Sequence, residues 1–472
     1  PISYIMADQQ IGYYFQDFTF KTNYKLNEKN KLFLSFYGGN DEAFIKYRER
    51  DSTSTYKSKY GLGWGNMIGA LRWNSILSKS LFSNTTLYYS KYRYSNGIQE
   101  EEYDRKADTL ILQRNLTFYN QVSDIGLKWD LDYFATNNLH VRTGFDVIVH
   151  SYMPGASDFI DFDASSDIKS TQGTKYQNVE LSAYAEADYS PLAQLNFNLG
   201  LRSTSTFLND YSRPILQPRL LARYKVNERL SFSTSFDVNA QYVHLVSNSS
   251  YGAPTDLWLP VMEGIPPQHA WQFTIGANYQ LTQGISLGLD VYRKKFSNLL
   301  EFKPTEIIDH NVSDWANVIL IGAGEAQGLE LMLEKRTGKL TGWVSYTLSK
   351  SDRQFEEINN GKVFPSSYDR RHNISVVSTY KINKNKEITA SWVYTSGFYL
   401  TMNYNWYVIN INGHEQVVSN YAERNNYRTP AYHRLDLSYS SSKQKKRGIR
   451  TWTFGLYNAY NRINPFMVYS SF

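Results

Sequence analysis

Apolar and polar residues alternate with a period of two along about eighteen separate stretches of this chain. The clearest stretch spans residues 271–281, where the even positions are polar or glycine. Its odd positions hold Trp271, Phe273, Ile275, Ala277, Tyr279 and Leu281. Successive side chains of a β-strand point to opposite faces, so each stretch predicts a strand with one apolar and one polar face.

The predicted strands follow one another along the whole chain. They lie at residues 12–24, 31–39, 60–77, 81–94, 116–134, 139–152, 178–189, 194–206, 215–226, 230–245, 270–281, 285–302, 328–335, 340–351, 371–380, 387–402, 431–440 and 450–461. Many run to about 12–18 residues, whereas the strands of soluble sandwiches and propellers usually have about 5–6. Such lengths are enough to cross a bilayer at a tilt.

The connections between these strands alternate in length. Short turns are predicted at residues 27–30, 78–80, 135–138, 282–284 and 336–339. Long loops are predicted at about 40–60, 95–115, 153–177, 246–268, 303–321, 352–370 and 403–430, with one shorter connection at 209–214. Tight turns at one end and long loops at the other are typical of a transmembrane antiparallel β-barrel, with periplasmic turns and extracellular loops. The fold class is therefore all-β.

The orientation of the two faces follows from barrel size. An interior formed by about eighteen strands is too wide to be filled by side chains, so the polar face should line the lumen and the apolar face should meet lipid. A soluble packed barrel would reverse this arrangement. Composition fits the membrane alternative: 16% of the residues are aromatic, and Tyr and Trp suit the membrane–water interface.

Composition also excludes several classes of protein. Mean hydropathy is −0.50, and no run of about 18 apolar residues could span a membrane as a helix. The chain has no cysteine, which removes disulfides, thiolate metal sites and cysteine nucleophiles. The net charge of +6 is spread too widely to predict binding to nucleic acid, and the densest basic run, 443–450, falls in a predicted turn.

Five segments carry more specific sequence features. They are residues 13–36, 328–350 (GLELMLEKRTGKLTGWVSYTLSK), 364–377 (FPSSYDRRHNISVV), 426–438 (NYRTPAYHRLDLS) and 456–466 (LYNAYNRINPF). These segments resemble TonB-dependent outer-membrane receptors of Bacteroidetes-type bacteria. The resemblance covers nearly the whole chain as barrel and carries little information on substrate.

The resemblance implies 22 strands and an N-terminal plug preceded by a TonB-contacting segment. Because the chain begins at Pro1 with about eighteen strands, we interpret residues 1–472 as a single β-barrel domain. The plug, the first three or so strands and the last strand are expected to lie outside it. The alternation of loops requires only that both missing strand counts be odd, and the total of 22 comes from the family. Alternatively, Phe472 is a true outer-membrane C-terminus.

The predicted lumenal face is rich in charge. These residues would either hold a plug through releasable salt bridges or simply line a hydrated pore, and the resemblance favours the plug. The candidates are Asp124, Lys128, Asp130, Arg142, Asp146, Glu186, Arg202, Arg219, Arg223, Asp290, Glu330, Glu334, Arg434 and Asp436.

The predicted extracellular loops carry aromatic residues that could stack on a ligand or pack the loops together. Loops on a rigid scaffold are where binding residues concentrate. The candidates for substrate contact are Trp258, Trp315, Tyr404, Trp406 and Tyr407.

Covalent chemistry has little support. Residues 368–372 form a Tyr-Asp-Arg-Arg-His cluster that is best interpreted as ion pairs anchoring a loop. The eight histidines show no metal-ligand spacing, and no phosphate-binding glycine loop is present. We therefore expect no catalytic residues, no metal and no cofactor, although a barrel hydrolase stays an alternative.

The resemblance implies an outer-membrane active transporter for a scarce, bulky nutrient such as a siderophore, cobalamin, glycan or peptide. Its expected partners are outer-membrane lipid, the TonB complex reached through the N-terminal region, and a surface lipoprotein. A plugless barrel that acts as a passive pore or as a scaffold in an envelope complex is the alternative.

Overall fold

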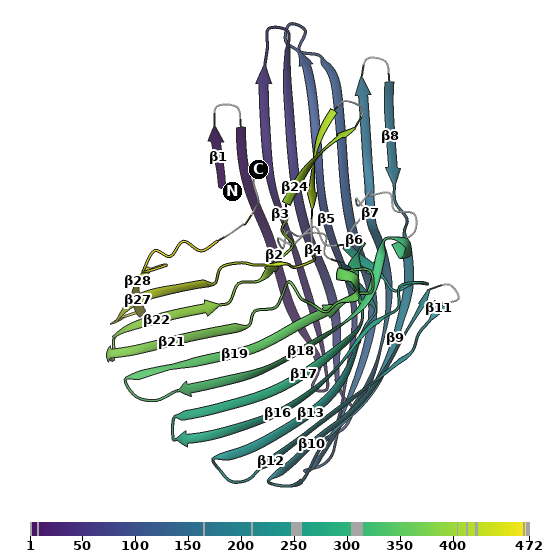
Figure 1. The fold of residues 1–472 in the computed structure, drawn as a ribbon. Helices are drawn as coiled ribbons and strands as arrows, with labels where there is room; N and C mark the ends of the chain where they lie inside the picture. The colour runs from purple at the N-terminus through teal and green to yellow at the C-terminus, as the bar shows by residue number, and fades with distance from the viewer. Residues whose placement is uncertain are drawn as a thin grey trace.

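The computed structural model describes residues 2–6, 9–163, 166–208, 211–246, 257–303, 315–403, 405–411, 414–420, 423–465 and 468. One large antiparallel sheet curves around an open interior (Figure 1). Within the described residues this sheet has 22 strands, and four of them are short: β1 (Ile2–Met6), β8 (Ser166–Gln172), β11 (Tyr211–Ser212) and β20 (Phe364–Pro365).

The other eighteen strands correspond one for one to the predicted strands. They are β2 (Gln9–Asn27), β3 (Asn30–Arg50), β4 (Ser54–Ile76), β5 (Leu81–Asp104), β6 (Leu110–Thr136), β7 (Leu139–Asp163), β9 (Tyr176–Leu192), β10 (Leu195–Leu208), β12 (Ile215–Lys225), β13 (Leu230–Gln241), β16 (Gln268–Thr282), β17 (Ile285–Phe302), β18 (Ile319–Lys335), β19 (Leu340–Gln354), β21 (His372–Asn383), β22 (Lys386–Thr395), β27 (Tyr432–Lys445) and β28 (Gly448–Leu456).

The long strands form a meander in which each pairs with the next, from β1–β2 through to β27–β28. The predicted tight turns close these hairpins. At three of them an asparagine side chain accepts a backbone N–H two residues later: Asn27, Asn227 and Asn383, the geometry of an Asx turn. Among the described residues, the outer edges of β1 and β28 have no strand partner.

The apolar parity of the strands lies on the solvent-accessible outer surface, as predicted. On β10, Leu199 and Leu201 are 46% and 51% exposed, whereas Thr204 on the opposite parity is 3% exposed. Directly opposed residues share a face, so the register extends this assignment from strand to strand. The separation is not complete, because Phe15 and Ile68 lie on the inner parity.

Three of the predicted long loops, 40–60, 95–115 and 153–177, are mostly strand, and this part of the prediction was wrong. Strands β3 to β8 continue past the rest of the sheet and form a tall extension (Figure 1). Outside the bilayer neither face meets lipid, so the extension lacks the two-residue alternation on which the prediction depended. The extension consists of the upper ends of β3–β7 together with β8.

Aspartates close two hairpins of this extension. The carboxylate of Asp51 accepts the backbone N–H groups of Thr53 and Ser54, both at 2.6 Å. These bonds lower the pKa of Asp51 to about 2, since they stabilise the charged form. Asp104 accepts the N–H groups of Lys106 and Ala107 at 2.7 and 2.8 Å, and its pKa is also lowered. In both turns an aspartate accepts the backbone N–H groups two and three residues later, and this local turn signal was missed in the loop assignments.

Several other predicted boundaries were also wrong. The strand predicted at 230–245 ends at Gln241, and β14 (Val243–Val246) leaves the sheet to pair with β15 (Leu257–Pro260). The strand predicted at 387–402 ends at Thr395, and the one predicted at 450–461 ends at Leu456. In contrast, β18 begins at Ile319 rather than at 328.

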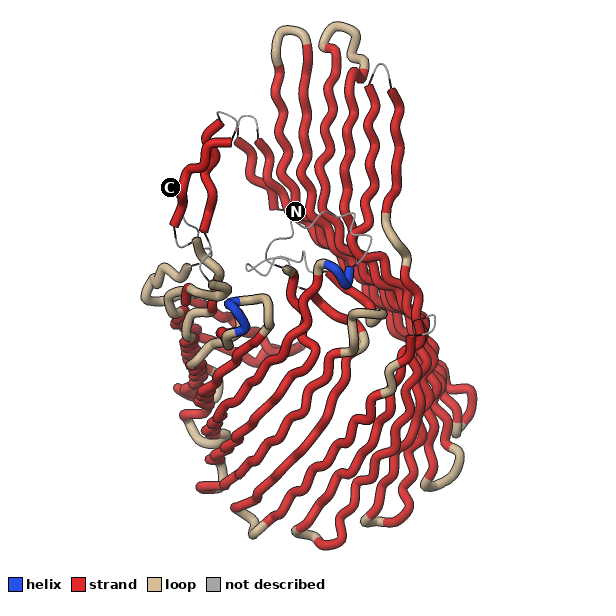
Figure 2. Tube along the Cα trace, turned by 45° about the vertical axis from the view of Figure 1, so that its right-hand side comes forward, coloured by secondary structure: helices blue, strands red, loops and turns tan. Residues whose placement is uncertain are grey.

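The remaining elements lie at the extracellular end of the sheet. They are β23 (Tyr399–Leu400) paired with β26 (Tyr427–Arg428), β24 (Asn405–Ile411) paired with β25 (His414–Asn420), and the short 3₁₀ helices η1 (Trp315–Asn317) and η2 (Asn359–Gly361). The β24–β25 hairpin rises opposite the tall extension (Figure 2). In the described part of the chain, no helix is long and apolar enough to cross a membrane.

Candidate functional site

The β14–β15 hairpin folds inward and crosses the interior of the barrel. Strand β15 packs against β6 and β7, while β14 packs against β17, and five wall strands separate β7 from β17 in the sheet. The indole of Trp258 on β15 meets the ring of Tyr92 on β5 edge-on at 6.5 Å between centroids. A segment that touches both walls must lie between them, so the hairpin narrows the lumen.

An apolar cluster holds the hairpin to the upper ends of β17 and β18. Trp315 is 2% exposed and lies at the centre of this cluster. Its buried members are Val246, Leu257, Leu259, Ile265, Leu300, Phe302, Trp315 and Ile319. Burying large apolar side chains contributes about 1.5–3 kcal/mol each, so the hairpin is a packed element of the barrel.

His244 on β14 is completely buried beside this cluster. Neither ring nitrogen forms a hydrogen bond with a residue that the structure describes. Burial lowers the pKa of His244 to about 4. The imidazole is therefore neutral at neutral pH, and protonation would place an unpaired charge in the middle of the hairpin.

The inner faces of β5 to β10 carry a continuous polar network, which we call the paired wall. In its upper part, His150 Nδ1 lies 2.8 Å from Asp124 Oδ1, and its Nε2 lies 3.7 Å from Glu180 Oε2. The Ser90 hydroxyl donates to Asp124 at 3.1 Å. The His150 side chain is only 10% exposed, so the carboxylates and the imidazole stabilise one another away from bulk water.

The lower part of the paired wall centres on Arg142. Its Nη2 lies 2.8 Å from Glu186 Oε1 and 3.3 Å from Asp188 Oδ2. The Asn198 amide donates to both carboxylates, at 2.7 and 2.8 Å. Across β7, the hydroxyl of Tyr184 on β9 donates to Asp130 on β6 at 2.6 Å. Glu186 and Asp188 are thus each held by more than one donor.

The remaining predicted charges of this region join the same wall. Lys128 Nζ lies 3.4 Å from Asp130, and Asp146 faces the lumen directly opposite Lys128 in the register. Arg202 donates to the Ser182 hydroxyl at 2.5 Å and to Thr204 at 3.2 Å. The sequence therefore predicted the correct face for Asp124, Lys128, Arg142, Asp146 and Arg202.

Three lumenal charges on β12 and β18, which we call the unpaired wall, differ from this network. Arg219, Arg223 and Glu330 lie on the inner face and are all exposed. Among the described residues none of the three forms an ion pair, and Arg219 donates only to Asn239, at 3.2 Å. These side chains are available to a further partner in the lumen.

The last predicted lumenal residues lie near other charges of their own strands or turns. Glu334 pairs with Arg336 of the adjacent turn at 2.7 Å. Arg434 Nη2 lies 2.8 Å from Asp436 on β27, and Asp436 also accepts the backbone N–H of Asn458 at 2.9 Å. Arg434 and Asp436 therefore tie the end of β28 back to β27.

The aromatic candidates divide into three groups. Trp315 is buried in the apolar cluster, and the partly buried Trp258 packs against Tyr92. Trp406 and Tyr407 on β24 are 37% and 51% exposed above the barrel. Tyr404 lies outside the described residues. Among the candidates that the structure describes, Trp406 and Tyr407 are the two with exposed rings.

Residues 368–372 anchor a loop, as predicted. Asp369 is 1% exposed and accepts the backbone N–H of Ser351 at 2.8 Å. Arg371 and Arg428 lie 3.6 and 3.8 Å from its carboxylate. A buried carboxylate held by two arginines and a backbone donor is a structural ion-pair cluster.

Sequence reasoning missed a second clamp between loops. Glu301 lies 3.0 Å from Arg353 and 3.2 Å from Arg424, three residues far apart in the chain. No local pattern could have revealed it, because its members meet only after β17 and β19 have each paired with β18 and residue 424 has folded against them. In the part of the chain that the structure describes, no group of three or more potential metal ligands converges.

Comparison with known proteins identifies a family with this architecture. The family model for a TonB dependent receptor-like β-barrel matches residues 5–461. Comparison with curated proteins gives no match.

Solved structures of similar fold are also found. The chain resembles the ferric-catecholate import receptor Fiu from E. coli K12 with 10% identity and a TM-score of 0.56, covering 96% of this chain and 77% of that one. The siderophore receptor PiuA from Acinetobacter baumannii shares 14% identity with a TM-score of 0.55, covering 98% and 78%. The copper transporter OprC shares 10% identity with a TM-score of 0.60, covering 96% and 75%.

Proposed function

This chain belongs to the TonB-dependent receptor-like β-barrel family, and from that premise we propose that it imports a scarce, bulky nutrient across an outer membrane by active transport. Members of the family are outer-membrane receptors that bind ligands and interact with TonB. The proposed cargo is of the class of siderophores, cobalamin, glycans or peptides. The work consists of binding and gating, with no covalent step.

A polar lumen crossed by a packed hairpin is the observation that supports active transport most directly. The β14–β15 hairpin joins the walls at β6–β7 and β17, which leaves less space for free diffusion of a large solute. A bulky cargo therefore needs an energised rearrangement to pass.

We propose that the unpaired wall holds a plug domain. Exposed lumenal charges without ion pairs, such as Arg219, Arg223 and Glu330, are free to form releasable bridges with a second domain. The charges of the paired wall are already linked to one another by ion pairs and hydrogen bonds, so this wall would serve as a rigid surface. Among the described residues the outer edges of β1 and β28 have no strand partner, which supports the further proposal that additional strands complete the barrel.

Substrate selection is assigned to the extracellular elements. Trp406 and Tyr407 on the β24–β25 hairpin are exposed, and aromatic rings stack on planar chelators, sugars and peptide side chains. Two of the similar structures are named as receptors for ferric chelates or siderophores and one as a copper transporter. Ferric siderophores are thus the first substrates to assay, followed by copper.

In the deciding experiment, the full-length gene is expressed in a Gram-negative host whose native siderophore receptors have been deleted. Uptake of radioactive iron is measured with a panel of ferric siderophores, with and without TonB. We expect at least one ferric siderophore, or copper in the parallel assay, to accumulate only when TonB is present.

The contrary outcome is equally clear. Uptake that proceeds at the same rate without TonB, together with increased sensitivity to large antibiotics, would identify a passive pore. Failure of the whole panel in the presence of TonB, while a glycan, cobalamin or peptide is imported, would keep active transport and reject the metal chelate.

A further inference from the structure

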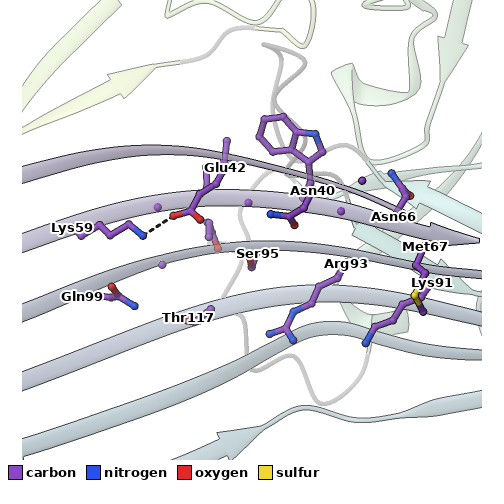
Figure 3. Close-up of a pocket in the computed structure, with 18 residues that line it drawn as sticks. Asn40, Glu42, Lys59, Asn66, Met67, Lys91, Arg93, Ser95, Gln99 and Thr117 are labelled. Carbon is purple, nitrogen blue, oxygen red and sulfur yellow. Dashed lines mark hydrogen bonds and ion pairs between the residues drawn. The ribbon is translucent and has the colours of Figure 1, made fainter. Parts of the chain in front are cut away.

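A polar groove lies across β3, β4, β5 and β6 (Figure 3). Its volume is about 560 Å³. Its floor is rich in glycine, at Gly61, Gly63, Gly65 and Gly97, and its rim carries the cationic side chains of Lys91 and Arg93. Neither cation belongs to the lumenal site described above.

The groove is on the outside of the barrel. Tyr92 contacts Trp258 of the inward hairpin, so Tyr92 faces the lumen. Its neighbours Lys91 and Arg93 must then face outward, since strand side chains alternate. The β4–β5 register is unbroken from the pair Ser54–Asp104 to the pair Ile76–Phe82. Directly opposed residues share a face, so the glycines of β4 that lie opposite outward residues of β5 also face outward.

The groove begins where the apolar outer surface ends. Along the outward parity of β5, an exposed Leu87 is followed by Tyr89, then by Lys91 and Arg93. At about 3.3 Å per residue, the two cations lie roughly 13 and 20 Å along the strand from Leu87. Apolar, aromatic and cationic side chains in this order follow the hydrocarbon, interface and headgroup layers of a leaflet.

The charges of the groove leave a positive excess. Lys59 forms an ion pair with Glu42, with 2.5 Å between Nζ and Oε1. Lys91 and Arg93 form no ion pair with any described residue. The Arg93 guanidinium lies over the ring of Tyr119 at 4.3 Å, which fixes its position through a cation–π interaction.

The glycine floor allows a ligand to approach the backbone. A Cβ at Gly61 would have as its nearest neighbour the Lys59 Cε at 3.9 Å, and one at Gly63 would meet the Ser95 hydroxyl at 3.4 Å. The space above these two residues is therefore open. A bulky headgroup can lie between the β4 backbone and the β5 cations.

We propose that this groove binds the phosphorylated headgroup of a lipid in the outer leaflet. Arginine and lysine are the side chains that recognise phosphate oxygens, and basic pockets at the membrane surface bind anionic headgroups. The site is separate from the transport path, so it stands whether or not the proposed cargo is correct.

The test uses the purified full-length receptor in a neutral detergent, with native mass spectrometry as the readout. Short-chain phosphatidic acid and phosphatidylcholine are titrated separately, and bound lipids are counted. The unmodified protein should bind phosphatidic acid about tenfold more tightly than phosphatidylcholine. Equal binding of the two lipids would overturn the proposal without any variant.

Two variants locate the site. Lys91→Glu combined with Arg93→Glu should remove the preference for phosphatidic acid, whereas Gly61→Leu keeps both charges and should weaken binding by filling the floor. Lys443→Glu combined with Lys445→Glu makes the same charge change in the β27–β28 turn and should have no effect. An unchanged preference in both groove variants, or a preference equally lost in the turn variant, contradicts the assignment.

Inorganic phosphate distinguishes the two sources of a phosphate group. It should fail to displace phosphatidic acid at equal concentration, because the acyl chains on the adjoining apolar surface add to lipid affinity. Displacement at equal concentration would mean that the groove recognises free phosphate, and the lipid proposal would be wrong.

Discussion

The two lumenal walls of this barrel carry similar charges in opposite states. On the paired wall, Arg142 contacts two carboxylates and His150 lies between Asp124 and Glu180. On the unpaired wall, Arg223 and Glu330 have no ionic partner within the described residues. Lumenal charges of this barrel thus occur in two states: linked to their neighbours in one network, or exposed without an ionic partner among the described residues.

The largest effect on stability is expected from a substitution that adds a bulky side chain to the paired wall. A Cβ at Gly144 would lie 2.4 Å from the Trp129 carbonyl oxygen and 2.9 Å from the Tyr184 ring. Gly144→Val should therefore destabilise the barrel by about 3 kcal/mol or more. Gly200→Ala is the matched control, since its Cβ would meet Glu186 at an ordinary 3.5 Å. Urea unfolding in detergent measures both, and equal midpoints would contradict the close packing of this wall.

A pH titration tests the β14–β15 hairpin, which packs against the paired wall at β6 and β7 and against β17 on the other side. The pKa of His244 is lowered to about 4, against about 6.5 in an unfolded chain. The stabilising effect of the neutral ring is complete above pH 6.5 and is lost as the pH falls toward 4, because the unfolded hairpin binds the proton more tightly.

The expected loss is on the order of 3 kcal/mol below pH 4. Hydrogen exchange at residues 257–260 should therefore accelerate between pH 6.5 and 4 beyond the intrinsic change in rate. A His244→Gln variant should lack this extra pH dependence, and a wild-type profile in that variant would remove His244 as the cause.

Removing one cation from each wall should show how much each cation contributes to the free energy of unfolding. Arg142→Ala leaves Glu186 and Asp188 close together without their arginine, and should cost about 1 kcal/mol, a modest amount because the arginine side chain is 42% exposed and screened by solvent. Arg223→Ala should change stability by no more than about 0.5 kcal/mol. The same urea midpoints apply, and equal losses would mean that the walls do not differ.

The smallest effect is expected in function. Arg219→Glu combined with Arg223→Glu should weaken plug docking and raise entry of a bulky antibiotic by roughly two- to fivefold. Surface abundance and folding should not change, and the turn variant at Lys443 and Lys445 controls for net charge. If antibiotic entry stays at the wild-type level, another part of the lumen holds the plug.

Local sequence patterns were sufficient for the strands and their faces. Alternation at residues such as Leu199 and Leu201 is required by lipid on one side and water on the other, so the strand, its outward parity and the lumenal position of Arg202 are all readable from spacing. The eighteen wall strands were therefore predicted from alternation. The anchoring role of Asp369 was predicted separately, from the charged cluster at residues 368–372.

The tertiary structure alone decided which groups meet. Whether Arg142 is paired or Arg223 is free depends on the cross-strand register, which a single strand does not encode. The burial of Trp315 and the path of the β14–β15 hairpin depend on contacts between distant segments, and the tall extension lacks the lipid boundary that creates a readable alternation. The bilayer imposes a pattern on each strand separately, whereas ion pairs, apolar clusters and grooves arise only between strands.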